Sequence, residues 1–257
     1  MDYSLKGKTA LVTGASRNIG RAIALAFAAR GADLVVNTRA NRAELDAVAA
    51  ECRRAGVRVH PALADVGDAA AVDAMVREAT AALGPIDVLV CNAAIRPHTS
   101  ITETSIDDWH RVMAVNLHSA FYLARAVVPG MKERGRGSII ALGGQSSITG
   151  RPNTSSVTAA KSGLLGFIRA LAAELGPAGI RANMVIPGFI DTERRYAEWY
   201  PEWKERGPGS PEQIKDIPLR RLGRPEDIAD ACVFLASDAS SYVTGDTIRV
   251  MGGRLIG

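Results

Sequence analysis

Cysteine is scarce in this sequence, and its three cysteines are far apart. Cys52, Cys91 and Cys232 lie in separate apolar stretches, so we expect reduced core thiols and neither a disulfide framework nor a metal site. Aromatic residues are also few, at 5% of the chain, whereas hydrophobic residues make up 47%. The core must therefore consist largely of Ala, Val, Leu and Ile, which suits Ala-rich helices packed closely on a sheet.

Long apolar runs and runs of like charge are absent as well. No stretch approaches the roughly 18 uninterrupted apolar residues of a membrane span, and residues 1–8 lack the apolar core of a secretory signal. We therefore expect a cytoplasmic protein without membrane partners. The net charge is +4, but the 31 basic residues are dispersed. This distribution indicates a solvated basic surface and no nucleic-acid partner.

Short apolar segments alternate with segments of helical periodicity along most of the chain. The predicted strands are 9–12, 32–37, 57–64, 86–91, 138–142, 181–186 and 247–251, and the predicted helices begin near residue 19 and then span 42–55, 68–83, 107–131, 155–175 and 226–235. This alternation predicts right-handed βαβ units in an α/β fold. The expected architecture is a Rossmann-like, doubly wound parallel sheet of about seven strands, with helices on both faces.

The alternation fails between about residues 189 and 224, where four prolines stand among tyrosines and tryptophans. We interpret this segment as an excursion over a substrate pocket rather than a second domain. A chain of 257 residues is longer than most single domains, but doubly wound folds of ~250 residues form one domain. The prediction is therefore one domain over residues 1–257.

A glycine-rich turn follows the first predicted strand directly and opens the first helix. Its sequence is Thr-Gly-Ala-Ser-Arg-Asn-Ile-Gly over residues 13–20. Backbone N–H groups and the helix dipole face an anion at such a turn, as a dinucleotide pyrophosphate requires. Asn18 breaks the glycine pattern, but Asn tolerates positive φ better than other non-glycine residues. The turn alone is a weak signal, since it can also belong to a doubly wound domain that binds nothing.

Further motifs strengthen the interpretation, because they follow in one order from about residue 5 to residue 253. The turn resembles the T-G-x-x-x-G-x-G loop of short-chain dehydrogenase/reductases, with Asn18 at the middle glycine. Residues 91–94, Cys-Asn-Ala-Ala, resemble the family's N-A-G element, with Ala94 for Gly, and residues 187–192 resemble its P-G-x-x-x-T loop. The chain is thus identified as a member of the classical type of this family, similar to 3-oxoacyl-acyl-carrier-protein reductases.

The resemblance implies a dinucleotide-binding domain and assigns residues to its site. The implied cofactor-binding residues are Gly14, Ser16, Arg17, Asn18, Ile19, Gly20, Thr38, Arg39, Asp65, Val66, Asn92, Ala93, Lys161, Pro187, Gly188, Ile190 and Thr192. It also implies a homotetramer, because residues 226–235 and 241–245 resemble the segments through which family members form two-fold interfaces.

NADP(H) is the predicted cofactor. The second strand ends in Asn37-Thr38-Arg39 and lacks the carboxylate that accepts the adenosine ribose hydroxyls of NAD. Arg39 and Arg17 could instead pair with a 2′-phosphate through charge-assisted hydrogen bonds. The alternative is that both arginines are solvated surface charges.

Two catalytic side chains expected from the resemblance are missing. The family carries Ser, Tyr and Lys where this chain has Gly144, Val157 and Lys161. Lys161 and Asn116 match the family's lysine and asparagine and imply roles at the nicotinamide ribose and a water. Valine cannot transfer a proton, and a missing general acid typically costs about 10²–10⁴ in rate.

His98, Ser146 and Tyr196 are the candidate substitutes for the missing groups. The resemblance places His98 at the pocket rim and Tyr196 in the lid, whereas Ser146 follows Gly144 closely. Ser146 has a simpler alternative role as a loop or helix-cap hydroxyl, and Tyr196 as a ring packed beside Trp199. Arg96, Arg194 and Arg195 could attract an acidic substrate or could be exposed lid charges.

Three functions stay open at this point. The first is an NADP(H)-dependent oxidoreductase acting on a small carbonyl or imine. An iminium substrate would be compatible with the missing general acid, since hydride addition to a cation needs no proton. The second is a non-redox enzyme in the same pocket. The third is a catalytically impaired NADP(H)-binding module. Fold alone does not decide among them.

Overall fold

The computed structural model describes residues 2–193 and 214–255. Its sheet has seven strands in the order β3-β2-β1-β4-β5-β6-β7, and all neighbouring strands are parallel. The strands are β1 (Thr9–Val12), β2 (Asp33–Thr38), β3 (Val59–Leu63), β4 (Val88–Cys91), β5 (Gly137–Leu142), β6 (Ile180–Pro187) and β7 (Thr247–Val250). The predicted α/β class and strand number are confirmed.

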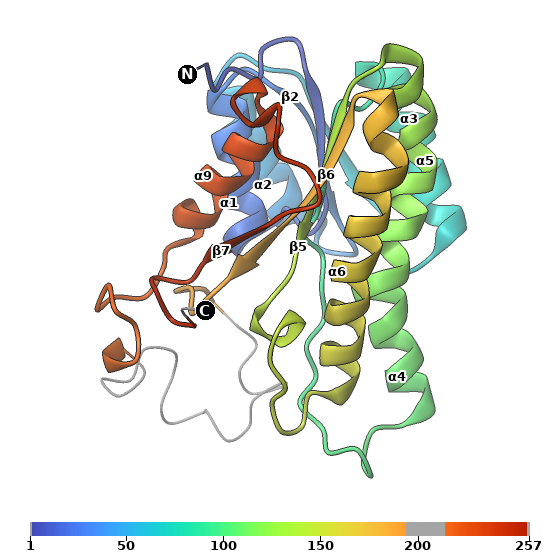
Figure 1. Cartoon of the computed structure of the whole chain (residues 1–257). Coiled ribbons are helices and arrows are strands. Elements are labelled where there is room, and N and C mark those ends of the chain that lie inside the picture. Colours follow the sequence, from blue (N-terminus) through green and yellow to red (C-terminus); the bar gives the residue numbers. More distant parts are fainter. Residues whose placement is uncertain (1, 194–213, 256–257) are drawn as a thin grey trace.

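Helices cover both faces of this sheet (Figure 1). One face packs against α1 (Asn18–Ala29), α2 (Arg42–Arg53) and α9 (Pro225–Ala236). The other packs against α3 (Ala69–Leu83), α5 (Ser119–Arg134) and α6 (Ser155–Leu175). β1 and β4 are buried along their whole length, because a parallel strand covered on both faces must be apolar on both. The three cysteines are buried, as expected of core residues.

Several predicted boundaries were wrong; for example, the second helix ends at Arg53 rather than at residue 55, and the fourth strand begins at Val88 rather than at residue 86. The expected helix over 107–131 is α4 (Ile106–Met113), a π-helical turn (Ala114–His118) and α5. The interruption was not predictable, since a single wide turn barely disturbs apolar periodicity. The third strand is shorter than the expected 57–64; it lies at the edge of the sheet, where Pro61 is tolerated. The lid was predicted over about 189–224, and its residues 194–213 lie outside the described part.

The strand order reverses between β1 and β4, which pair with each other while their chains lead to opposite sides of the sheet. Loops diverge at such a reversal and leave a crevice at the carboxyl ends of the strands. In Figure 1 this edge lies at the bottom of the sheet, where β5 leads toward the start of α6. The topology therefore places a binding crevice there.

Candidate active site

One cavity of about 720 Å³ lies at the carboxyl edge of the sheet. It is lined by residues of the glycine-rich turn, the ends of β2 and β4, the segment after β5, and the 187–192 loop. Every residue named above for the cofactor lines it, from Gly14 to Thr192. The structure therefore brings the predicted set together in one space, although their individual roles stay predictions.

The glycine-rich turn is fixed by hydrogen bonds to the chain after β4. Asn92 Nδ2 donates to the carbonyl oxygens of Thr13 (2.8 Å) and Gly14 (3.1 Å). In return, Thr13 Oγ1 accepts from the backbone N–H groups of Asn92 and Ala93. Gly14 adopts φ +62°, a conformation that glycine enters without steric cost. The Asn92 motif thus holds the turn in shape.

Gly20 stands where no side chain fits. A Cβ at this position would collide with the Gly14 carbonyl oxygen and would lie 2.6 Å from Asn92 Nδ2. The missing side chain keeps the turn narrow and its backbone accessible, which is what close approach of a pyrophosphate requires. The turn therefore fits a dinucleotide.

The variant Gly20→Ala is expected to weaken NADPH binding by at least ~10-fold, because the added methyl group must push the turn away from Asn92. Titration of NADPH fluorescence measures the loss. Gly166→Ala is the matched control, since a Cβ on this exposed α6 glycine meets nothing within 4 Å. The control should bind normally and melt slightly higher. Equal affinity of both variants would contradict the assigned role of the turn.

Asn18 has positive φ, +51°, as its residue type allowed. Its side chain makes a contact that the sequence did not reveal. Asn18 Nδ2 donates to the Glu193 carbonyl oxygen at 2.8 Å, and the Glu193 N–H donates back to Asn18 Oδ1 at 3.2 Å. The glycine-rich turn is thus tied to the chain that follows the 187–192 loop.

The far end of the cavity carries positive charge beside β2. Arg17, Thr38 and Arg39 line it, and residues 37–39 contain no carboxylate. Asp65, also in the lining, is engaged by Arg111 at 2.7 Å and by the Gly67 N–H at 2.9 Å. Burial opposes the shift, but these hydrogen bonds hold the pKa of Asp65 below its usual range. Asp65 therefore stays ionised and paired.

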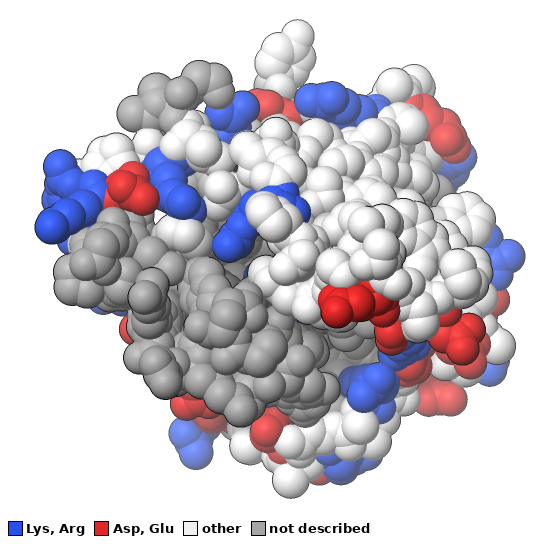
Figure 2. Space-filling view, turned by 90° about the horizontal axis from the view of Figure 1, so that it is seen from below, with Lys and Arg blue, Asp and Glu red and all other residues white. Residues whose placement is uncertain are grey.

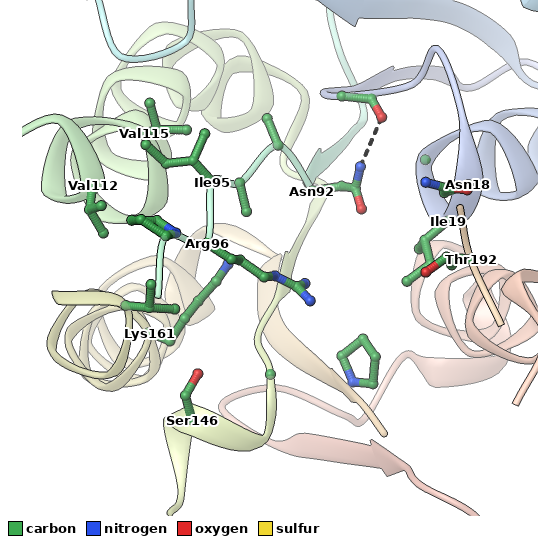
Figure 3. A pocket seen from close by; sticks show the side chains of 18 of the residues that line it. Asn18, Ile19, Asn92, Ile95, Arg96, Val112, Val115, Ser146, Lys161 and Thr192 are labelled. Atoms are coloured by element: carbon green, nitrogen blue, oxygen red, sulfur yellow. Dashed lines mark hydrogen bonds between the residues drawn. The ribbon is translucent and has the colours of Figure 1, made fainter. Parts of the chain in front are cut away.

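Lys161 lies at the opposite end of the cavity, on α6. Its Nζ donates to the Leu142 carbonyl oxygen at 2.6 Å, and the residue is only 2% exposed. Burial and, to a smaller extent, the nearby charge of Arg96 lower the pKa of Lys161 to about 7, while the Cys91 thiol acts in the opposite direction. Figure 3 shows the Lys161 and Arg96 side chains reaching into the same part of the pocket.

Gly144 and Val157 line the same cavity as Lys161. Val157 is 5% exposed and packs with Val112 and Ala160. Gly144 has an extended backbone, φ 176° and ψ 166°, and a Cβ there would meet only Ser146 Oγ, at 3.6 Å. Neither residue offers a proton donor to the pocket.

The other residues predicted to take part in catalysis do not all lie in the described cavity lining. His98 and Ser146 line the cavity, and Tyr196 lies outside the described residues. Asn116 lies behind the wall rather than in the described lining: its Oδ1 accepts from the Ile95 N–H (2.9 Å) and its Nδ2 donates to the Ile95 carbonyl oxygen (2.8 Å). Both ends of its amide thus hold the segment that carries Arg96.

Within the described residues there is no group of three or more His, Cys, Asp or Glu side chains that could hold a metal ion. Across the same residues, none of the helices has the length and apolar character needed to cross a membrane.

Comparison with known proteins gives a single family. Residues 14–254 match the family model described as enoyl-(acyl carrier protein) reductase. The chain is 38% identical over 246 residues to the 3-oxoacyl-(acyl-carrier-protein) reductase FabG of Staphylococcus aureus strain N315, covering 96% of this chain and 97% of that protein. It is 36% identical over 250 residues to FabG of Escherichia coli strain K12, covering 97% and 98%.

Solved structures of related proteins superpose on nearly the whole length of this chain. A short-chain type dehydrogenase/reductase from Mycobacterium marinum is 34% identical, with a TM-score of 0.88 over 100% of this chain and 98% of that one. A candidate NAD(P)-dependent gluconate 5-dehydrogenase from Beutenbergia cavernae, solved with NADP bound at low occupancy, is 36% identical, with a TM-score of 0.89 over 98% of each chain.

Proposed function

The chain belongs to the classical short-chain dehydrogenase/reductase family, and from that premise we propose that it is an NADP(H)-dependent oxidoreductase acting on a small carbonyl or imine substrate. One observation carries the proposal: a single cavity runs from the glycine-rich turn to Lys161. The relative solved with NADP bound supports this cofactor class. Bound NADPH would supply the hydride. The residues of the chain must bind and orient the cofactor and the substrate, and must supply the proton that the reduced substrate takes up.

The proposed NADP preference comes from charge. The adenosine end of the cavity has Arg17 and Arg39 in its lining and no carboxylate at residues 37–39. A 2′-phosphate there would gain charge-assisted hydrogen bonds, whereas NAD would find no carboxylate for its ribose hydroxyls.

Replacing Arg39 by Gln is expected to raise the NADPH dissociation constant by about 10-fold or more, the loss typical of a charged hydrogen bond, and to leave NADH binding unchanged. Arg42→Gln is the control, because Arg42 is exposed, pairs with Asp46 and is not in the described lining. Fluorescence titration with both dinucleotides measures the effect. A wild-type protein that binds NADH more tightly than NADPH would contradict the preference.

If Gly144 and Val157 occupy the positions of the family's Ser and Tyr, the proton for the reduced substrate must come from another group than in the rest of the family. We propose that Lys161 is the proton donor: the ammonium gives a proton to the oxygen of the reduced carbonyl and is reprotonated from water. Its position in the cavity and a pKa near 7 suit that role. An iminium substrate would not need the step. His98 is the alternative donor in the described lining.

The same two positions favour a second candidate function, an NADP(H)-binding module without turnover, because neither Gly144 nor Val157 offers a hydroxyl. Following NADPH oxidation with a panel of ketones, imines and enones separates the two. Product formation without NADPH oxidation would indicate a non-redox enzyme instead.

We also propose a homotetramer, formed through α9 and residues 241–245. Tyr242 in the second segment is fully exposed in the single chain, as an interface residue would be. Sedimentation at micromolar concentration should give the tetramer mass, and a clean monomer would contradict the proposal.

A further inference from the structure

We propose that Asn18 closes a strap over the bound dinucleotide, and that this strap opens each time the dinucleotide enters or leaves. The strap consists of the Asn18 side chain, the Glu193 backbone and the two hydrogen bonds between them. The identity of the ligand as a dinucleotide rests on the proposed function. Asn18 is then a positioning residue, which acts through Glu193 on the rates of cofactor exchange.

The link between Asn18 and Glu193 uses both ends of one amide. Asn18 Nδ2 donates to the Glu193 carbonyl oxygen at 2.8 Å, and Asn18 Oδ1 accepts from the Glu193 N–H at 3.2 Å. An amide can donate and accept at the same time, so a peptide unit is a matching partner for it. Two bonds fix the orientation of the partner segment as well as its distance.

The conformation of Asn18 indicates that its side chain is needed there. Its φ is +51°, which glycine would adopt without steric cost, and the family's loop has glycine at this position. Any residue with a Cβ is less favourable in this region, although Asn tolerates it best. Within the described part of the chain, both bonds of the Asn18 side chain go to Glu193, and neither caps α1. The amide therefore serves the strap.

The segment that carries Glu193 is anchored before it reaches Asn18. Gly223 N–H donates to the Phe189 carbonyl oxygen at 2.9 Å, and Asp191 N–H donates to the Gly223 carbonyl oxygen at 2.8 Å. Residues 192–193 follow this anchor directly, and both line the cavity. The anchored segment thus presents the Glu193 backbone to the glycine-rich turn at a defined place.

The strap closes a ring across the carboxyl end of the sheet. The glycine-rich turn follows β1 and residues 188–193 follow β6, while β4 and β5 lie between these two strands. Residues after β4 and β5 line the same cavity, so the strap and the four strand ends together encircle part of it. Figure 3 shows Asn18, Ile19 and Thr192 on the side of the pocket opposite Lys161.

A dinucleotide in this cavity would have one end on each side of the ring. Arg39 follows β2, which lies beyond β1 and outside the encircled strands, whereas Lys161 binds the Leu142 carbonyl at the end of β5, among them. A molecule that spans both places has a bulky ring system at each end and cannot be exchanged easily through a closed ring. It would enter from the carboxyl edge of the sheet, which faces the reader in Figure 2.

The strap should affect the rates of exchange more than the affinity. Its two bonds join groups of the protein only, so they stabilise the closed state with and without the cofactor. Without them the open state is more populated in both forms, and the association and dissociation rate constants rise together. A residue that contacts the cofactor itself would change mainly the dissociation rate constant.

Stopped-flow fluorescence of NADPH measures both rate constants in the wild type and in Asn18→Gly. Glycine adopts φ +51° without strain and removes both bonds. We expect both rate constants to rise at least ~10-fold, the effect of two lost hydrogen bonds, and the dissociation constant to change less than ~3-fold. Asn153→Gly is the matched control, because Asn153 also has positive φ, +60°, and is exposed outside the described lining.

Hydrogen exchange measures the strap without any cofactor. The Glu193 N–H donates to Asn18 Oδ1, so in the apoprotein it should exchange at least ~10-fold faster in Asn18→Gly than in the wild type or in Asn153→Gly. Thermal melting checks that both variants fold. If Asn18→Gly does not fold, a wild-type Glu193 amide that exchanges as fast as in an unstructured peptide would still overturn the strap.

Unchanged rate constants in a folded Asn18→Gly variant, or a dissociation rate constant that rises alone, would overturn the strap. Equal exchange of the Glu193 amide in this variant and the wild type would do the same. A wild type that binds no dinucleotide would instead contradict the proposed function. If the wild type binds NADPH and the variant exchanges it equally fast, the strap alone fails.

Discussion

Replacing Val157 by Tyr together with Gly144 by Ser is expected to raise kcat for reduction of an activated ketone by at least ~10²-fold, the lower end of the contribution of a general acid. Position 157 is four residues before Lys161 on α6, so both side chains lie on one helix face. A phenol there would be next to an ammonium group, which favours its ionised form. The NADPH dissociation constant should hardly move.

The two positions differ in how much space they have for a larger side chain. Gly144 has an extended backbone that any residue can adopt, and a Cβ would meet only Ser146 Oγ at 3.6 Å. Val157 is buried against Val112, so the larger Tyr must enter the cavity or strain this contact. Thermal melting checks folding, and Val157→Phe with Gly144→Ser is the matched control, since it adds the ring without the hydroxyl. An unchanged rate in a folded, NADPH-binding Tyr variant would favour the binding-module alternative.

Replacing Lys161 by Met is expected to lower kcat by at least ~10², because the proposed proton donor is lost. In the wild type, kcat/KM for reduction should fall as pH rises through about 7, the pKa of Lys161 before substrate binds, since only the protonated amine can donate. Lys132→Met, on α5 outside the described lining, is the control. A wild-type rate in the Met variant, or a rate that does not fall above pH 7 in the wild type, would rule out Lys161 as the donor.

Lys161 also predicts a pH dependence of stability that needs no substrate. Its pKa falls from 10.5 in the unfolded chain to about 7 in the folded apoprotein. Between these values the unfolded chain binds the extra proton, so the free energy of unfolding should rise with pH across this window. The Met variant should lack that contribution, and melting curves of both proteins over the same pH series measure the difference.

The sequence predicted the fold well, because buried parallel strands such as β1 and β4 carry continuous apolar runs that mark them directly. The residues predicted to bind the cofactor came from motifs that resemble those of the family, and the structure brings these residues together in one cavity. Contacts between distant segments left no such pattern: nothing local signals that Asn18 binds the Glu193 backbone or that both ends of the Asn116 amide hold Ile95. The contact of Arg254 with Gln145 was missed for the same reason, because it depends on how two loops meet.

We propose that this chain transfers hydride although it has Gly144 and Val157 in place of a serine and a tyrosine. The most direct test supplies NADPH deuterated at the nicotinamide C4 position, together with oxo acids, ketones and imines, and searches the products for deuterium by mass spectrometry. Deuterium is expected on the former carbonyl or imine carbon in the presence of the protein and not in its absence. Tight NADPH binding with no deuterium in any product would contradict it.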